Sequence, residues 1–189
     1  MNKFEITLHK YLDLFADQEM YFLNDKRNVD LFSQNPLNRD AGTIQMKVSS
    51  INDEEFRLHV SPDEMVKHIL SLNIDNRLKQ GDITVVEAIA DIPSDGKKHN
   101  LLHFASAYCN FHRPDAFPIY AEQHFDFYRR YIKNYNLPLD VEKLNTYPVF
   151  CAALKDLVER LGLTGKMNYL QIRKFGWLYA EKVVNESKE

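Results

Sequence analysis

The chain of 189 residues is 44% hydrophobic and 12% aromatic and has a net charge of −3, which is enough apolar material for one substantial core. Its apolar runs are far shorter than the roughly 20 residues of a membrane span, and no apolar signal segment follows Met1. We therefore expect a soluble, cytoplasmic protein with a single domain over residues 1–189 and no membrane partner. Two cysteines, Cys109 and Cys151, are too few for a disulfide scaffold.

The charge is distributed unevenly along the chain. Residues 1–96 carry 10 Lys and Arg against 17 Asp and Glu, whereas residues 97–189 carry 14 against 10. An acidic N-terminal half is thus followed by a basic helical half over residues 97–184 and a short, frayed tail over residues 185–189. We expect an anionic partner to bind to the basic half.

The first third of the chain contains one clear helical pattern and one ambiguous pattern. Apolar residues at helical spacing predict an opening helix from Phe4 to about Phe22. The polar stretch over residues 24–42 predicts a loop around a short turn. Residues 44–48 and 56–60 then alternate between apolar and polar, which is typical of a small N-terminal β-hairpin, although the same letters also fit a helix.

The remainder of the chain predicts helices separated by proline and glycine. Ser61 and Pro62 begin a predicted helix that reaches Leu72, and Gly81 ends a shorter one. The prolines at 114 and 118 interrupt the pattern. Further helices are predicted over residues 82–90, 98–111, 120–135, 147–161 and 168–184. The fold class is therefore mainly α, a multi-helix domain, and we expect the flanking aromatic residues to place Trp177 in its core.

Four of the seven histidines lie between residues 99 and 124. His99 and His103 have the i, i+4 spacing of two metal ligands, but no third ligand follows at a typical distance, so we expect no metal. The chain also lacks a phosphate-binding glycine loop, and we expect no cofactor. The candidate catalytic residues are His103, His112 and Asp115, beside the loop from Pro114 to Pro118.

Basic residues of the second half are candidates for contacts with a nucleic-acid backbone, in which cations neutralise phosphates. A solvated helix face is the ordinary alternative for such residues. The predicted nucleic-acid-binding residues are Lys97, Lys98, Arg113, Arg129, Arg130 and Lys133.

The segment Phe104–Tyr120, which reads FASAYCNFHRPDAFPIY, resembles the motif FASKYCxFHxPxxFPIYD of an uncharacterised bacterial protein family. The later segment Gln171–Trp177 is similar to the xIDKFLW helix of the same family, so the resemblance spans about residues 82–180. It implies no known activity.

The helix, proline loop and helix at this joint also distantly resemble the core of the helix-hairpin-helix DNA glycosylases. That resemblance implies a DNA-binding architecture, in which the family places a catalytic Lys and Asp. Here the two positions hold His103 and Ala121, and the glycine-rich hairpin is reduced to Asp95–Lys98. The implied function is a non-catalytic binding module, with nucleic acid as a candidate ligand. The alternatives are an enzyme with its site near Pro114–Pro118 and a protein–protein interaction module.

Overall fold

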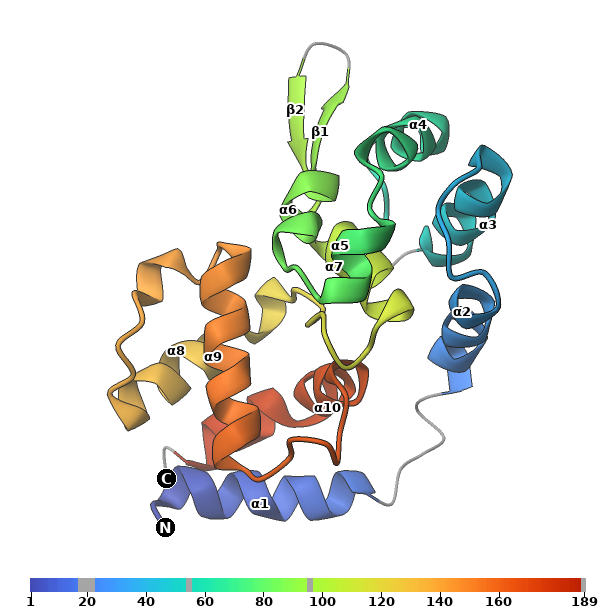
Figure 1. Ribbon diagram of the computed structural model, residues 1–189. Coiled ribbons are helices and arrows are strands. Elements are labelled where there is room, and N and C mark those ends of the chain that lie inside the picture. The colour runs from blue at the N-terminus through green and yellow to red at the C-terminus, as the bar shows by residue number, and fades with distance from the viewer. Residues whose placement is uncertain (17–22, 54–55, 95–96, 188–189) are drawn as a thin grey trace. The chain divides into compact units, whose positions relative to one another are not determined.

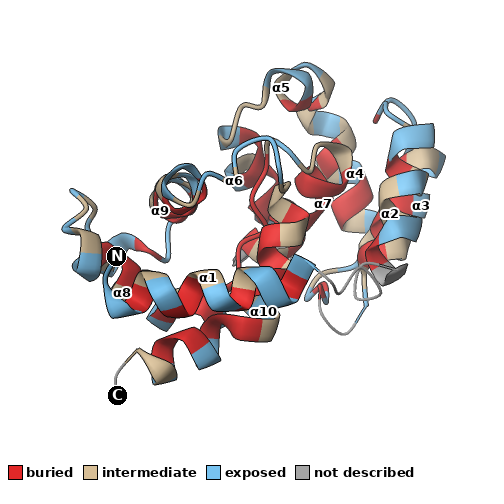
Figure 2. Ribbon diagram, turned by 90° about the horizontal axis from the view of Figure 1, so that it is seen from below, coloured by how far each residue is buried: buried red, intermediate tan, exposed pale blue. Residues whose placement is uncertain are grey.

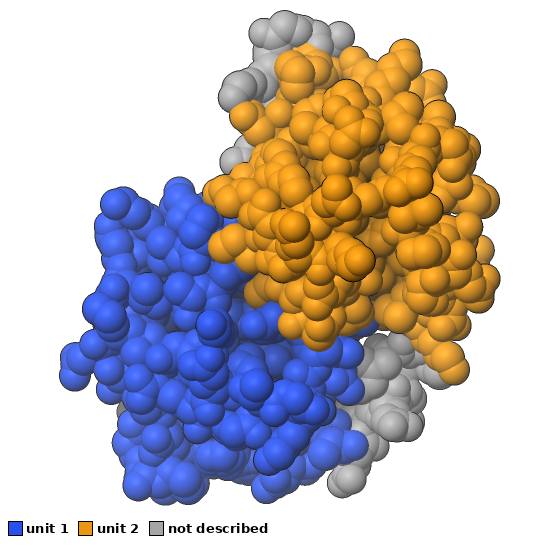
Figure 3. Space-filling model, viewed as in Figure 1, with its two compact units in different colours: residues 1–23, 121–189 blue, residues 24–120 orange. Residues whose placement is uncertain are grey.

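The computed structural model describes residues 1–16, 23–53, 56–94 and 97–187, and this part of the chain is mainly helical (Figure 1). The chain divides into two compact units (Figure 3). Residues 24–120 form one unit, and residues 1–23 and 121–189 together form the other. None of the described helices combines the length and the apolar character that are needed to cross a membrane.

The unit of residues 24–120 consists of helices and one β-hairpin. Helix α3 packs against α4, and α6 packs against α7. The hairpin strands are antiparallel, with Asp91 opposite Asn100 and Ser94 opposite Lys97. The elements are α2 (Leu23–Gln34), α3 (Ala41–Ile51), α4 (Pro62–Leu72), α5 (Asp75–Gln80), α6 (Thr84–Ala90), β1 (Asp91–Ser94), β2 (Lys97–Asn100) and α7 (Leu102–His112).

The β-hairpin predicted over residues 44–60 is wrong, because α3 occupies residues 41–51. Asp40 caps this helix by accepting a hydrogen bond of 2.8 Å from the backbone N–H of Thr43. The buried side chains recur at helical spacing, and Met46, which completed the apparent alternation, is 49% exposed. These buried side chains are Ile44, Lys47, Val48 and Ile51. The described hairpin lies at residues 91–100 instead.

The loop predicted over residues 24–42 is also wrong, since α2 fills most of that range. The mostly polar helix buries Phe32, whose ring centroid lies 5.2 Å from that of Tyr108 and 5.7 Å from that of Phe111. One aromatic anchor therefore attaches a helix that has too few apolar residues to show a period.

The helix predicted from Pro62 to Leu72 is confirmed. Its first turn is closed by a hydrogen bond of 3.2 Å from the backbone N–H of Ser61 to a carboxylate oxygen of Glu64. Gly81 ends α5 at a φ of 70°, in the left-handed region that favours glycine.

Helix α7 begins later than predicted, because residues 97–100 pair with β1 as a strand. The loop after α7 returns into the protein interior, and Phe117, Ile119 and Tyr120 are all buried. The side-chain amide of Asn110 donates a hydrogen bond of 2.6 Å to the carbonyl of Phe117, and the backbone N–H of Tyr120 donates one of 2.9 Å to Ser106 Oγ. The proline loop is thus fixed as part of the packing.

In the second unit, α1 lies against α10 (Figure 2). The ring centroids of Tyr11 and Tyr179 are 5.0 Å apart, and those of Phe15 and Phe175 are 5.7 Å apart. The predicted opening helix is confirmed over residues 3–16, and its remainder, residues 17–22, lies outside the described residues. The elements are α1 (Lys3–Ala16), η2 (Glu122–His124), α8 (Phe125–Tyr135), η3 (Val141–Lys143), α9 (Tyr147–Arg160) and α10 (Tyr169–Glu186).

The prediction that Trp177 lies in the core is wrong, because its side chain is 59% exposed. Phe175 and Tyr179 are buried on either side of it in the sequence. Successive helical residues are about 100° apart, so residues two positions away on either side point toward the opposite half of the helix. The aromatic neighbours therefore face the interior while Trp177 faces solvent.

Candidate functional site

The three predicted catalytic residues do not form one constellation. His103 and His112 are nine residues apart on α7, a rise of about 13 Å along the helix axis. The ring of His103 packs at 4.7 Å from that of Phe56. Asp115 is an exposed carboxylate that forms an ion pair of 2.9 Å with Arg113. Each residue has its own local role.

His112 belongs to a buried polar cluster, which we call the Lys47 cluster and define as Asn38, Lys47, Tyr108 and His112. Lys47 has no exposed surface, and its Nζ donates hydrogen bonds of 2.9 Å to both the carbonyl of Leu37 and Asn38 Oδ1. The same ammonium lies 3.4 Å from His112 Nε2. The Tyr108 hydroxyl donates a bond of 2.6 Å to Asn38 Oδ1. The cluster thereby connects α3, α7 and the segment before α3.

Burial governs the electrostatics of the Lys47 cluster. It lowers the pKa of Lys47 to about 8, although the carboxylate of Asp75 acts in the opposite direction. Burial, together with the nearby charge of Lys47, lowers the pKa of His112 to about 3. Two ammonium protons of Lys47 are donated to the carbonyl of Leu37 and to Asn38 Oδ1, and His112 Nε2 lies beside the same ammonium, so the polar groups of the cluster contact one another. The geometry supports a packing role for the cluster.

The six predicted nucleic-acid-binding residues are divided equally between the two units. Arg113 is committed to its own unit, because its guanidinium donates 2.7 Å to the carbonyl of Lys79 and 2.9 Å to Asp115. Lys97 and Lys98 lie on β2, and their side chains are outside the described part of the structure. The other three cations lie on α8.

Helix α8 is strongly amphipathic. Its buried face carries four apolar or aromatic side chains, and Arg129, Arg130 and Lys133 lie outside that face. Arg130 donates a hydrogen bond of 3.3 Å to the carbonyl of Val184, which holds its guanidinium beside the end of α10. The buried residues are Phe127, Tyr128, Tyr131 and Ile132.

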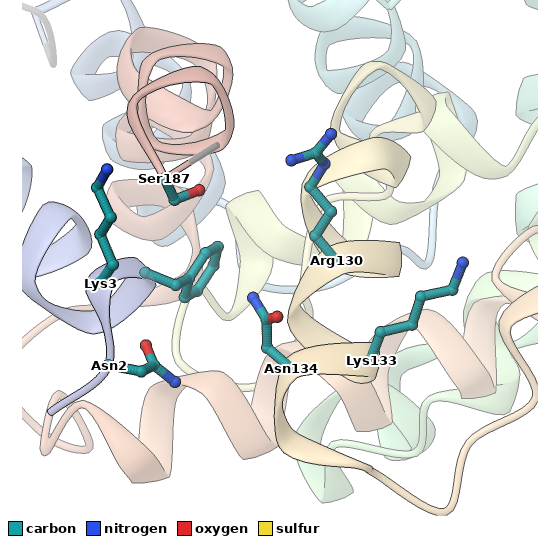
Figure 4. Close-up of a pocket in the computed structure, with 7 residues that line it drawn as sticks. Asn2, Lys3, Arg130, Lys133, Asn134 and Ser187 are labelled. Carbon is teal, nitrogen blue, oxygen red and sulfur yellow. The ribbon is translucent and has the colours of Figure 1, made fainter. Parts of the chain in front are cut away.

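Two of these cations line a pocket of about 400 Å³, which we call the α8 pocket (Figure 4). Its walls come from α8, the start of α1 and the end of α10. All of its described charged residues are cations, and Lys3, Arg130 and Lys133 form no ion pair with a described residue. The lining residues are Asn2, Lys3, Phe4, Arg130, Lys133, Asn134 and Ser187.

The carboxylates that are close in sequence to this pocket have other partners. Glu5 accepts hydrogen bonds of 2.8 Å from both the backbone N–H of Asn2 and the hydroxyl of Tyr135, which lower its pKa. Glu186 accepts from the hydroxyl of Tyr11 and forms an ion pair of 2.9 Å with Lys10, and these contacts lower its pKa as well. Among the described residues, the lining cations thus have no carboxylate partner.

A second hollow of about 620 Å³ lies between α8 and α10, and we call it the α8–α10 groove. It shares Arg130 and Lys133 with the α8 pocket but also contains acidic groups. Arg129 forms an exposed ion pair of 2.9 Å with Asp126, a kind of contact that a ligand displaces at small cost. The lining residues are Gln123, Asp126, Arg129, Arg130, Lys133, Glu181, Val184 and Asn185.

Sequence reasoning identified Arg129, Arg130 and Lys133 but missed Lys3. Lys3 lies in the acidic half of the sequence, more than a hundred residues from α8. No local motif connects these segments, and only the packing of α1 against α10 and of α10 against α8 within this unit brings them together.

The described structure is that of a mainly helical protein with a cationic pocket in one of its units. Residues 7–116 match the model of the HI_0787_N family, which is described as an N-terminal domain, and the chain belongs to this family. An uncharacterised protein of Haemophilus influenzae (strain ATCC 51907 / DSM 11121 / KW20 / Rd) is 32% identical over 120 residues. The match covers 54% of this chain and 56%, just over half, of that relative. No solved structure gives a significant match.

The family match includes all residues of the Lys47 cluster, whereas α8 and α10 follow the matched residues. The family is thus shown for the part of the chain that contains the buried cluster. The function of the α8 pocket has to be argued from its own chemistry.

Proposed function

We propose that this protein is a non-catalytic binding module that holds nucleic acid by its phosphate backbone, in the α8 pocket. The observation that carries the proposal is that Lys3, Arg130 and Lys133 line one pocket and form no ion pair with any carboxylate in the described part of the chain. Cations in such a pocket neutralise phosphates and release their condensed counterions.

The remaining lining groups support an oxygen-rich anion as the ligand. The side-chain amides of Asn2 and Asn134 carry N–H donors suited to phosphate oxygens, whereas the Ser187 hydroxyl donates to the carbonyl of Val184 and can only accept from a ligand. Donors of this kind position a backbone and carry no base information. We therefore expect binding with little dependence on sequence.

The proposal requires no glycosylase chemistry. The ring of His103 packs against that of Phe56, and Ala121 is buried and carries no group that could act on a substrate. The resemblance between the segment that joins α7 to α8 and the glycosylase core stays a prediction. The cytoplasmic location, which we expect from the composition, also stays a prediction. The alternative is an enzyme with its site near Pro114–Pro118. Its three candidate residues lie apart in the structure, so their positions do not support this alternative.

The test measures the binding of fluorescein-labelled oligonucleotides by anisotropy across a series of salt concentrations. Three phosphate contacts predict a slope of log K against log salt of about −2 for a single strand and about −3 for a duplex. Because residues near both ends of the chain line the pocket, the affinity tag is removed beforehand.

The double variant Arg130→Gln, Lys133→Gln should weaken binding and, by the loss of two phosphate contacts, reduce the magnitude of the salt slope by about 1.4 for a single strand and about 1.8 for a duplex. The matched control is Lys155→Gln, Lys166→Gln, which removes the same charge from exposed positions outside the pocket. Absence of binding at about 50 mM salt, or equal losses in both double variants, would refute the proposal.

A further inference from the structure

We infer that the nucleic acid held here is an unpaired strand, one of whose bases stacks on Trp177. This inference rests on the proposed function and names the form of its ligand. It begins from a feature that packing does not explain: the single tryptophan of the chain is 59% exposed. A large aromatic surface left in water, one helical turn from a groove that contains Arg129, Arg130 and Lys133, is suited to base stacking.

Helical geometry places Trp177 in line with the α10 wall of the α8–α10 groove. Glu181 and Val184 line the groove and follow Trp177 by four and seven residues, so all three lie within about 60° around the helix. Trp177 therefore extends the same wall by one turn toward the N-terminus of α10.

The cations lie toward the other end of the groove. A Cβ added at Gly176 would lie 3.1 Å from the ring of His124, and further along both segments Arg130 donates to the carbonyl of Val184. Because the later residue of one segment contacts the later residue of the other, η2 and α8 run in the same direction as α10. Trp177 is thus at the His124 end and Arg130 at the Val184 end. The helical rise between Trp177 and Val184 is about 10 Å, the length of about three stacked nucleotides of one strand.

The charges along the groove fit a strand in this arrangement. Arg130 and Lys133 suit phosphates, whereas the carboxylate of Glu181, between them and Trp177, repels phosphate and can accept a hydrogen bond from a base N–H, such as N3–H of thymine. A duplex buries the faces of its bases in its own stack and offers Trp177 none. An unpaired strand offers every base face.

The test uses the fluorescence of the single tryptophan together with oligonucleotide affinity. We expect an oligo(dT) of about 12 nucleotides to quench the Trp177 emission, and Trp177→Ala to weaken its binding by roughly ten-fold or more. Duplex affinity should stay unchanged in that variant. Trp177→Phe, which keeps an aromatic face, should restore most of the affinity for oligo(dT). A poly(rU) strand tests whether RNA is held in the same way.

The outcomes separate this inference from the proposed function. Binding of oligo(dT) without quenching, with equal affinity in Trp177→Ala, would overturn the stacking inference and leave backbone binding intact. Tighter binding of duplex than of oligo(dT) would do the same. Failure of both ligands to bind would overturn the proposed function itself. A concentration-dependent self-association that Trp177→Ala abolishes would assign the exposed ring to a protein contact and overturn the inference.

Discussion

The free energy of unfolding of the protein should rise as the solution becomes alkaline, and replacing the buried Lys47 with methionine should remove this rise. The side chain has no exposed surface, and burial lowers its pKa from 10.5 to about 8. Below about pH 8 the folded and unfolded states both carry the charge, and the native state bears the full cost of burying it. Between the two pKa values the unfolded state binds more protons, so the free energy of unfolding rises with pH.

The size of this effect follows from the pKa values. One pKa unit corresponds to about 1.4 kcal/mol, so the complete change is about 3 kcal/mol, of which about 2 kcal/mol falls between about pH 7 and pH 9.5. Lys47→Met carries no charge at any pH and has a similar length, so it should lack this rise. Tyrosines titrate in both proteins and largely cancel in the difference.

Urea unfolding of both proteins at several pH values measures the effect. Lys67→Met is the control, because Lys67 is exposed on α4 and its removal should leave the slope unchanged. NMR titration of ¹³C-labelled lysines, assigned with Lys47→Met, gives the pKa directly. A difference between wild type and Lys47→Met that stays constant from about pH 7 to pH 9.5 would refute the argument from burial.

Three further predictions concern single side chains. Burial lowers the pKa of His112 to about 3, so below about pH 6.5 the unfolded state binds a proton that the folded state does not, and wild type loses stability as the pH falls. His112→Asn cannot bind this proton. In urea titrations at about pH 4 it should therefore keep up to about 3 kcal/mol of the stability that wild type loses. Gly176→Ala places a Cβ 3.1 Å from the His124 ring. Because the cost of this overpacking should exceed the gain in helix propensity, the urea midpoint should fall by the equivalent of about 1 kcal/mol. A higher midpoint would show that the ring moves aside. Asn168→Ala removes the 2.9 Å cap to the Gln171 N–H and should cost about 1 kcal/mol by thermal unfolding, whereas Asn168→Asp, which retains an acceptor, should be nearly neutral.

Local signals in the sequence predicted much of the helical framework. The contacts that begin and end helices join residues three or four positions apart, as Ser61 and Glu64 do, or depend on one backbone conformation, as at Gly81. Such features can be read in a short window. The same window failed at α3, where three alternating apolar letters concealed the longer helical spacing from Ile44 to Ile51.

Positions in the fold that depend on distant partners could not be predicted in this way. The acceptors of the Lys47 ammonium lie nine and ten residues before it, but Tyr108 and His112, which complete the cluster, are 70 positions from Asn38 and 65 positions from Lys47, so a short window of sequence does not indicate that Lys47 is buried. The charge difference between the two halves indicated the segment that forms α8, where Arg130 and Lys133 form no ion pair with a described residue. It also concealed Lys3, because an average over 96 residues says nothing about a single side chain that the packing of α1 brings to α8. Charge along a chain therefore identifies candidate segments, and the fold shows which of their cations line one pocket. Lys3, Arg130 and Lys133 line the α8 pocket without an ion pair to any described residue, whereas Arg113 is bound to the carbonyl of Lys79 and to Asp115.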